Sequence, residues 1–295
     1  MTTLPTSTAK KLGLVIDLDT CVGCHACVVN CKEWNTSGYG VPLSDQDPYG
    51  ADPTGAWLNR IHTFEVTPHE DKGAGEVIGI AGEARVVHFP KSCLHCEDAP
   101  CVTVCPTGAS YKREEDGIVL VDEDMCIGCG LCAWSCAYGA REMDIAAGVM
   151  KKCTLCVDRI YNDELEEVDR QPACVRTCPA GARHFGDLAD PTSDVSVLVK
   201  ERGGFDLMPE QGNKPVNLLW NRQQGLKTAL VAFAFQMQGQ CEARVGYEWK
   251  RMGRVNCKRG QHRKHFVHKV IGQKFLIRGR QIIAGQKMNA LIFHF

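Results

Sequence analysis

The sequence predicts an α+β fold that is built from small repeated units instead of one large core. Three observations indicate this fold. Sixteen of the 18 cysteines among the 295 residues fall into four groups of four between Cys21 and Cys178. A short stretch of β-forming residues leads into each of the first three groups. Between the first two groups, residues 32–92 form a long insertion rich in Gly, Pro and Asp, which is typical of a loop.

The spacing of the cysteines is the most specific signal in the chain. The four groups are Cys21, Cys24, Cys27 and Cys31; Cys93, Cys96, Cys101 and Cys105; Cys126, Cys129, Cys132 and Cys136; and Cys153, Cys156, Cys174 and Cys178. Groups one and three follow the run C-x2-C-x2-C-x3-C, group two lengthens one gap, and group four has a 17-residue gap. In this run three thiolates hold one 4Fe–4S cube and the fourth cysteine ligates a neighbouring cube. Four runs therefore predict four 4Fe–4S clusters.

Two other uses of the cysteines are less favoured by the pattern. Disulfide scaffolds are typical of small secreted proteins, and this chain is neither small nor marked for secretion. Zinc sites use C-x2-C pairs, but zinc needs only four ligands and usually takes two such pairs. The third and fourth cysteines of each run favour iron–sulfur clusters, and zinc remains the alternative.

The elements around the cysteines follow a repeated order. Strands are expected at residues 12–20, 84–90 and 117–125, and an Asp116-Gly117 turn precedes the third. A strand that delivers the chain to each cysteine loop, followed by a short helical stretch, is the pattern of a small ferredoxin unit. We therefore expect tandem two-cluster ferredoxin-like units made of four quarter-units. Cluster ligation must supply much of their stability, because little of the fold can rest on a conventional core.

Several residues between the cysteines have predicted supporting roles. Gly23, Gly128 and Gly130 are expected to give the ligand loops backbone freedom, and their amides can point at cluster sulfurs. His25 and His95 are expected to line the sites or form hydrogen bonds, not to ligate iron.

Basic and aromatic side chains also flank the ligands. Lys32, Lys151 and Lys152 are candidates to offset the negative charge of the clusters, although exposed lysines are common in loops. Trp134 and Tyr138 are expected to pack over a cube and keep water out.

Composition excludes several classes of protein. The charged fraction is 23% and the net charge is −1, values that suit one large or two modest globular domains and not a disordered or coiled-coil chain. The longest apolar run, 229–235, is far shorter than the ~20 residues of a membrane span. No export signal is evident, so a cytoplasmic location is expected, with export to the periplasm in complex with a signal-bearing partner as the alternative. No nucleophile–base pair, phosphate loop or nicotinamide fingerprint stands out, so we expect no catalytic site in this chain.

The last segment differs in charge from the rest. Residues 1–213 carry 18 Lys and Arg against 33 Asp and Glu, whereas residues 214–295 carry 16 against 2. Residues 221–295 contain no Asp, Ser or Pro, although roughly four prolines would be expected at average usage. This basic tail is interpreted as an extension outside the working domain, with an arm for anionic lipid or nucleic acid as the alternative.

With these motifs in hand, the chain resembles the four-cluster iron–sulfur subunits of membrane-bound molybdenum oxidoreductases. That family includes the subunits of dimethyl sulfoxide reductase, polysulfide reductase and sulfite dehydrogenase. The matching stretches include IDLDTCVGCHACVVNCKEWN, CLHCEDAPCVTVCPTGASYK, MCIGCGLCAWSCAYGARE and PACVRTCPAGARHFGDLADPTS. The resemblance covers about residues 12–220, and the insertion after Cys31 is most similar to the sulfite dehydrogenase branch.

The resemblance implies a nested arrangement of the ligands, whereas spacing alone would equally allow groups adjacent in sequence to pair. The implied sets are Cys21, Cys24, Cys27 and Cys178 for cluster one; Cys153, Cys156, Cys174 and Cys31 for cluster two; Cys93, Cys96, Cys101 and Cys136 for cluster three; and Cys126, Cys129, Cys132 and Cys105 for cluster four. Cys129 stands where the nitrate reductase branch has Trp and a 3Fe–4S centre, so four 4Fe–4S cubes are expected here.

The same resemblance implies a division of the chain. The expected parts are 12–31 with 150–190 for clusters one and two, 32–92 as a loop-rich insertion, 93–149 for clusters three and four, 191–220 as a C-terminal wrap, and 221–295 as a basic tail of unknown role.

The function implied by the resemblance is electron transfer between two partners. Cluster one faces a molybdopterin-containing catalytic subunit, and cluster four faces a quinone-reactive integral membrane anchor subunit, which holds the chain at the membrane. Electrons flow from sulfite to quinone or in the reductive direction, and no nucleic acid is expected as a partner. The alternatives are a soluble polyferredoxin-like carrier and a zinc-binding, nucleic-acid-binding protein.

Overall fold

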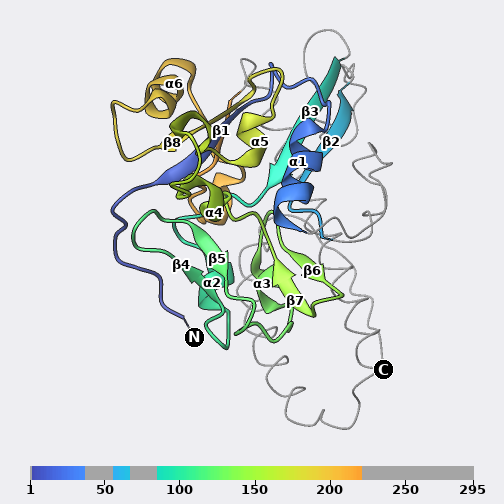
Figure 1. Cartoon of the computed structure of the whole chain (residues 1–295), viewed down its shortest axis with the longest axis vertical. Helices are drawn as coiled ribbons and strands as arrows, with labels where there is room; N and C mark the ends of the chain where they lie inside the picture. Colours follow the sequence, from blue (N-terminus) through green and yellow to red (C-terminus); the bar gives the residue numbers. More distant parts are fainter. Residues whose placement is uncertain (1, 37–55, 67–84, 221–295) are drawn as a thin grey trace, which may run out of the picture. The chain divides into compact units, whose positions relative to one another are not determined.

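Strand β1 (Leu12–Asp17) lies in the middle of a three-stranded sheet, between β8 (Arg183–Asp187) and β9 (Leu218–Trp220). The structure, a computed structural model, describes residues 2–36, 56–66 and 85–220. β1 pairs antiparallel with β8 and parallel with β9, so it joins the start of the chain to its later part (Figure 1). The side chains of Leu14 and Ile16 are at most 1% exposed, which places β1 in the core.

A turn ends β1 and carries the chain into the first cysteine group. The carboxylate of Asp17 accepts hydrogen bonds from the backbone N–H groups of Asp19 and Thr20, at 2.9 and 3.0 Å. Because these two N–H groups bond to the Asp17 side chain, they are not available to pair with a neighbouring strand, and the chain forms a turn. The strand predicted for residues 12–20 therefore ends three residues early.

Helix α1 (Ala26–Asn35) begins inside the first cysteine group and packs against α5 (Ala173–Arg176), which carries Cys174 (Figure 1). Helix α4 (Val157–Ile160) directly follows Cys156, the second cysteine of the fourth group. The structure thus brings the first and fourth cysteine groups together, although 121 residues separate Cys31 from Cys153 in sequence.

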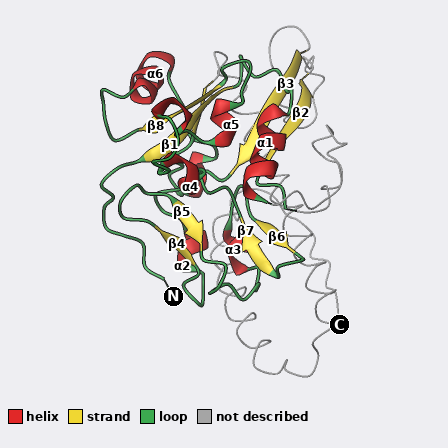
Figure 2. Cartoon of the chain, in the orientation of Figure 1, coloured by secondary structure: helices red, strands yellow, loops and turns green. Residues whose placement is uncertain are grey.

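The second and third groups form a similar arrangement. Helix α2 (Pro100–Thr103) packs against α3 (Leu131–Ser135), and the short antiparallel pair β4 (Ser110–Lys112) and β5 (Val119–Val121) lies between them in sequence. A second short pair, β6 and β7, follows α3; its strands are Glu142–Asp144 and Val149–Lys151. As Figure 2 shows, loops connect these short elements throughout.

The turn predicted at Asp116-Gly117 is confirmed. Gly117 has a φ of +73°, and its N–H donates to the carbonyl of Arg113 at 3.2 Å. The strand predicted for residues 117–125 is much shorter than expected, because only three residues of β5 pair with β4.

The insertion contains more regular structure than the sequence suggested. β2 (Asn59–Val66) and β3 (Arg85–Ser92) form an antiparallel pair in full register, and β2 also contacts α1. β3 confirms the strand predicted at 84–90, whereas β2 lies in the stretch 32–92 that was expected to be mostly loop. The remaining parts of the insertion, 37–55 and 67–84, lie outside the described residues.

The chain after β8 returns to the central sheet. Helix α6 (Asp194–Arg202) is capped at its start by Ser193, whose hydroxyl accepts the N–H of Ser196, and ends at Gly203 with a φ of +74°. Two 3-10 turns, η1 (Glu167–Asp169) and η2 (Pro209–Gln211), flank this part of the chain.

The remaining sequence predictions concern membrane-spanning helices, the basic tail and the division into domains. None of the helices in the described ranges has the length and apolar character needed to cross a bilayer. The basic tail predicted for residues 221–295 lies outside the described residues, and the division into domains stays a prediction.

Candidate iron–sulfur sites

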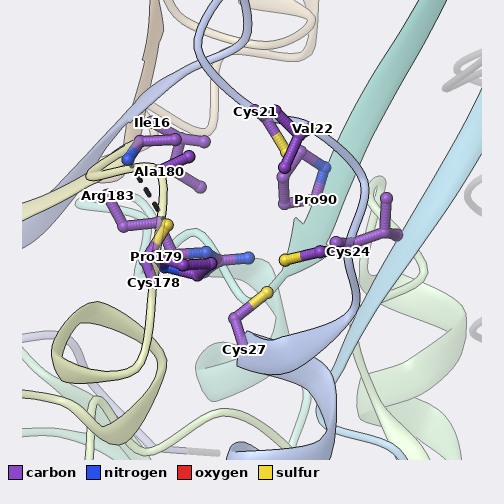
Figure 3. A pocket seen from close by; sticks show the side chains of 12 residues that line it. Ile16, Cys21, Val22, Cys24, Cys27, Pro90, Cys178, Pro179, Ala180 and Arg183 are labelled. Carbon is purple, nitrogen blue, oxygen red and sulfur yellow. Dashed lines mark hydrogen bonds between the residues drawn. The ribbon is translucent and has the colours of Figure 1, made fainter.

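Three cavities in the described part of the chain are each lined by four cysteines. The first site consists of Cys21, Cys24, Cys27 and Cys178, whose side chains surround one cavity of about 320 Å³ (Figure 3). The third site consists of Cys93, Cys96, Cys101 and Cys136, around about 360 Å³. The fourth site consists of Cys105, Cys126, Cys129 and Cys132, around about 310 Å³. Each of the three cavities offers the same donor set of four cysteine sulfurs.

The four remaining cysteines meet in a second site. This second site consists of Cys31, Cys153, Cys156 and Cys174. The side-chain amide of Asn35 donates to Cys31 Sγ at 3.7 Å and to Cys156 Sγ at 3.6 Å, which ties the first group to the fourth. The structure therefore groups the cysteines in the nested order and not by neighbours in sequence.

The donor set fits 4Fe–4S cubes better than single zinc ions. A tetrahedral zinc site needs four sulfurs that converge on one point at about 2.3 Å from the metal. Within the described ranges, no three Cys, His, Asp or Glu side chains converge closely enough to hold a single metal ion. The cysteines instead line the walls of a cavity, as the separate iron corners of a cube require. Apolar side chains such as Ile16 and Pro90 complete the wall of the first cavity.

All four cysteine loops share one backbone feature. The residue before the second cysteine is left-handed in each: Gly23 (φ +66°), His95 (φ +46°), Gly128 (φ +61°) and Leu155 (φ +53°). This conformation turns the N–H of His95 towards Cys93 Sγ and the N–H of Leu155 towards Cys153 Sγ, both at 3.5 Å. The prediction of backbone freedom at the glycines is confirmed, and the same requirement at His95 and Leu155 was missed.

Further backbone amides donate to the sulfurs. The N–H groups of Ser110 and Ala182 lie 3.3 Å from Cys105 Sγ and Cys178 Sγ, and the N–H of Met150 lies 3.4 Å from Cys126 Sγ. Such donors withdraw charge from thiolates and raise the reduction potential of a cluster. No sequence motif marks these amides, because every residue except proline carries one.

Burial opposes ionisation of the free thiols. It raises the pKa of Cys136 and of Cys153 to about 12, and that of Cys132 and of Cys174 to about 11. A thiolate in such surroundings needs a positive partner. Iron supplies that partner when a cluster binds, so ligation and proton release are coupled in these sites.

The two histidines of the loops differ in their surroundings. His95 is fully buried, and its Nδ1 accepts a hydrogen bond from the N–H of Val119 at 3.1 Å, so it supports the loop as predicted. His25 begins α1 with a left-handed backbone, and neither of its ring nitrogens has a hydrogen-bond partner among the described residues.

The flanking lysines also differ. Lys152 is 3% exposed, and its Nζ donates to the carbonyl of Cys153 at 2.5 Å. Lys32 instead donates to the carbonyl of Ala56 and lies over the ring of Trp57, and Lys151 pairs with two carboxylates.

Two other residues near the sites complete the comparison with the sequence predictions. Tyr138 lines the third cavity, as expected, whereas Trp134 is half-buried and lines none of the three cavities described above. Sequence reasoning missed Arg141 and Arg183, which are both buried beside the cysteines.

Comparison with known proteins agrees with this arrangement. Two family models described as "4Fe-4S dicluster domain" match residues 20–109 and 84–188. Two dicluster domains give four 4Fe–4S clusters in the chain.

Individual relatives point in the same direction. The chain is 60% identical to a sulfite dehydrogenase subunit of Allochromatium vinosum over 207 residues, which are 70% of this chain and 81% of that protein. It is 38% identical to a putative dimethyl sulfoxide reductase iron-sulfur subunit of Halobacterium salinarum, over 69% of this chain and 76% of that protein. It is 32% identical to one polypeptide of the polysulfide reductase of Wolinella succinogenes, over 75% of this chain and the whole of that polypeptide. From the cysteine sites, the dicluster domains and these relatives together, the chain belongs to the family of four-cluster iron–sulfur electron-transfer subunits of molybdopterin oxidoreductases.

Proposed function

We propose that the four cysteines of each site ligate one 4Fe–4S cluster, and that the chain relays electrons from a molybdopterin catalytic subunit to a quinone-reactive membrane subunit during sulfite oxidation. The 60% identity with a sulfite dehydrogenase subunit supports the choice of sulfite. When bound, such clusters take up and pass on single electrons. The residues of the chain position the clusters and keep water away from them.

The single observation that carries the proposal is the order in which the sites adjoin. The first and second sites adjoin, because Cys27 and Cys31 both lie on α1, which packs against α5 and its Cys174. The third and fourth sites adjoin, because α2 packs against α3 and Arg141 lines both cavities. Cys93 and Cys153 lie close enough to interact electrostatically, so the third site adjoins the second. The four sites thus form a row in the order one, two, three, four. A row with one site at each end suits electron transfer between two different partner subunits.

Both ends of this row lie beneath exposed apolar side chains. Val22 lines the first cavity and is 61% exposed, while Ile127 lines the fourth cavity and is 54% exposed. Exposed apolar side chains directly over a redox site suit docking of a partner protein. By the family organisation, the first site faces the catalytic subunit and the fourth faces the membrane subunit, which would hold this chain at the membrane.

Purification of the full chain from its native membranes tests the proposal. A tagged chain is expected to carry about sixteen irons and to co-purify with a molybdenum-containing subunit and an integral membrane subunit. Sulfite added without air is expected to reduce the clusters, which electron paramagnetic resonance (EPR) detects. A chain that purifies alone with all its iron, and is reduced by several unrelated donors but not by sulfite, would support the polyferredoxin-like carrier instead.

A further inference from the structure

Two buried arginines occupy equivalent places in the sequence repeat. Arg141 ends the segment CAYGAR, and Arg183 ends the segment CPAGAR. Each therefore lies five residues after the last cysteine of its group. Arg141 is 5% exposed and Arg183 is 4% exposed. The corresponding segment after the second group, CPTGAS, ends in Ser110 instead.

Arg141 lies between the third and fourth sites, because it lines both cavities. Its Nη2 donates to Ser110 Oγ at 2.8 Å, so the two equivalent positions of the repeat contact each other. Its Nη1 is buried and has no hydrogen-bond partner within the described ranges. The guanidinium thus has unused donors between two cysteine sites.

Arg183 lies between the first and second sites in the same way. It lines the first cavity (Figure 3), and it interacts with Cys174 of the second site through its charge and a hydrogen bond. Its Nη2 donates to Asn59 Oδ1 at 3.0 Å, and in the part of the chain that the structure describes its Nη1 is buried without a partner.

Both arginines keep a permanent charge that other protein groups do not balance. A guanidinium is not deprotonated in proteins, and a buried charge is costly unless an opposite charge faces it. None of the ion pairs found among residues 2–36, 56–66 and 85–220 includes Arg141 or Arg183. The groups that face them are the cysteines of the neighbouring sites, which carry negative charge once they ligate iron as thiolates.

We propose that Arg141 and Arg183 each hold a positive charge between two neighbouring clusters and thereby raise the reduction potentials of both. Reduction adds one electron to a cluster and breaks no bond, so it increases the negative charge that faces the arginine. The arginine therefore stabilises the reduced form more than the oxidised form. This inference rests on the ligand sets proposed above and not on the identity of the partner subunits.

Lys152 is a further buried basic side chain beside the sites. It is 3% exposed, and its Nζ donates to the carbonyl of Cys153 in the second site. Burial lowers the pKa of Lys152, so its charge is not permanent like that of the two arginines.

Redox titration of the full chain in its native complex, followed by EPR, tests the proposal. The variants are Arg141→Gln and Arg183→Gln, which remove the charge, and Arg141→Lys and Arg183→Lys, which keep it. Each Gln variant is expected to lower two of the four midpoint potentials, and the two variants are expected to affect different pairs. The Lys variants are expected to stay near the wild type.

Arg176→Gln is the matched control, because Arg176 is close in sequence to Cys174 and Cys178 but is 51% exposed and pairs with Asp169. It is expected to leave all four potentials unchanged. Unshifted potentials in both Gln variants with full iron content would overturn the inference, and so would equal shifts in the Gln and Lys variants.

If a variant loses clusters, its iron content still tests the proposal. Loss of iron in the Gln variants with retention in the Lys variants supports the need for a charge, whereas equal loss in both contradicts it. A wild-type chain with fewer than four clusters would overturn the ligand sets and this inference together. Four clusters in the wild type with unshifted variants would overturn this inference alone.

Discussion

At the scale of single residues, the cysteine loops depend on backbone conformations that most side chains do not tolerate. Gly128 has a φ of +61°, and a Cβ at this position would lie 2.3 Å from the carbonyl oxygen of Gly148. Because that neighbour is backbone, it cannot move aside as a side chain would. Gly148 is also left-handed, with a φ of +71°, but nothing lies within 4 Å of where its Cβ would be.

This pair gives a matched prediction. Gly128→Ala should lose the fourth cluster, because it adds a steric overlap to the ~1–2 kcal/mol cost of a left-handed Ala. The iron content should fall from about sixteen to about twelve per chain, as measured by metal analysis and EPR spin count. Gly148→Ala has only the conformational cost and should keep all its iron. Equal iron loss in the two variants would contradict this reasoning.

Some functional residues could be predicted from the sequence, and others could not. The sixteen cysteines are evident from spacing, because ligation imposes a fixed pattern on the chain. Arg141 and Arg183 were missed although a repeated G-A-R segment follows their cysteine groups, since a lone arginine in a loop is usually a surface residue. Leu155 was missed because left-handed backbone at a bulky residue depends on the fold around it and not on its own preference.

At the scale of elements, the helices near the cysteines are too short to be stable alone. Helices α2, α4 and α5 have four residues each, and α3 has five. Isolated helices shorter than about 12 residues are marginal in water. These elements therefore depend on the ligand loops that they adjoin.

Removal of iron should consequently unfold these elements. Treating the full chain with a chelator under oxidising conditions should abolish much of its helical signal, because the metal–thiolate bonds that order the loops are lost. Far-ultraviolet circular dichroism measures the loss, and anaerobic reconstitution with iron and sulfide should restore the signal. An iron-free chain with unchanged ellipticity and unchanged resistance to protease would show that the elements stand without the clusters.

The elements were predictable to different degrees. β1, β3 and the turn at Gly117 followed from apolar runs and turn residues, which act locally. β2 was missed because a Gly- and Pro-rich stretch precedes it, and its pairing with β3 spans residues far apart in sequence. β5 is shorter than its apolar run because its partner β4 has only three residues. The partner of a β-strand, unlike its local preference, cannot be predicted from the sequence of that strand alone.

At the scale of the whole molecule, binding of a partner at one end of the row of sites should be lost without affecting binding at the other end. Val22→Glu places a charge over the first site, and Ile127→Glu places one over the fourth. Each should weaken binding of one partner by roughly 30-fold or more, the size of a typical interface hot spot of about 2 kcal/mol. Each should leave the other partner bound, as measured by co-purification and by the iron content of the chain.

Val168→Glu serves as the comparison for this pair. Val168 is 60% exposed but lies in η1 and lines none of the three cysteine-lined cavities described above. It should leave both partners bound. Simultaneous loss of both partners in either terminal variant would argue against two separate docking ends.

The nested order of the cysteines also dictates when each site can be completed during synthesis. The cysteines of the third and fourth sites all lie between Cys93 and Cys136, so these sites have their full sulfur complement while the rest of the chain is still being translated. The first site needs Cys178, and β1 needs β9 at residues 218–220, before either is complete. We therefore expect the inner sites to be the first that can be completed, whereas the earliest cysteines to leave the ribosome are among the last to be enclosed.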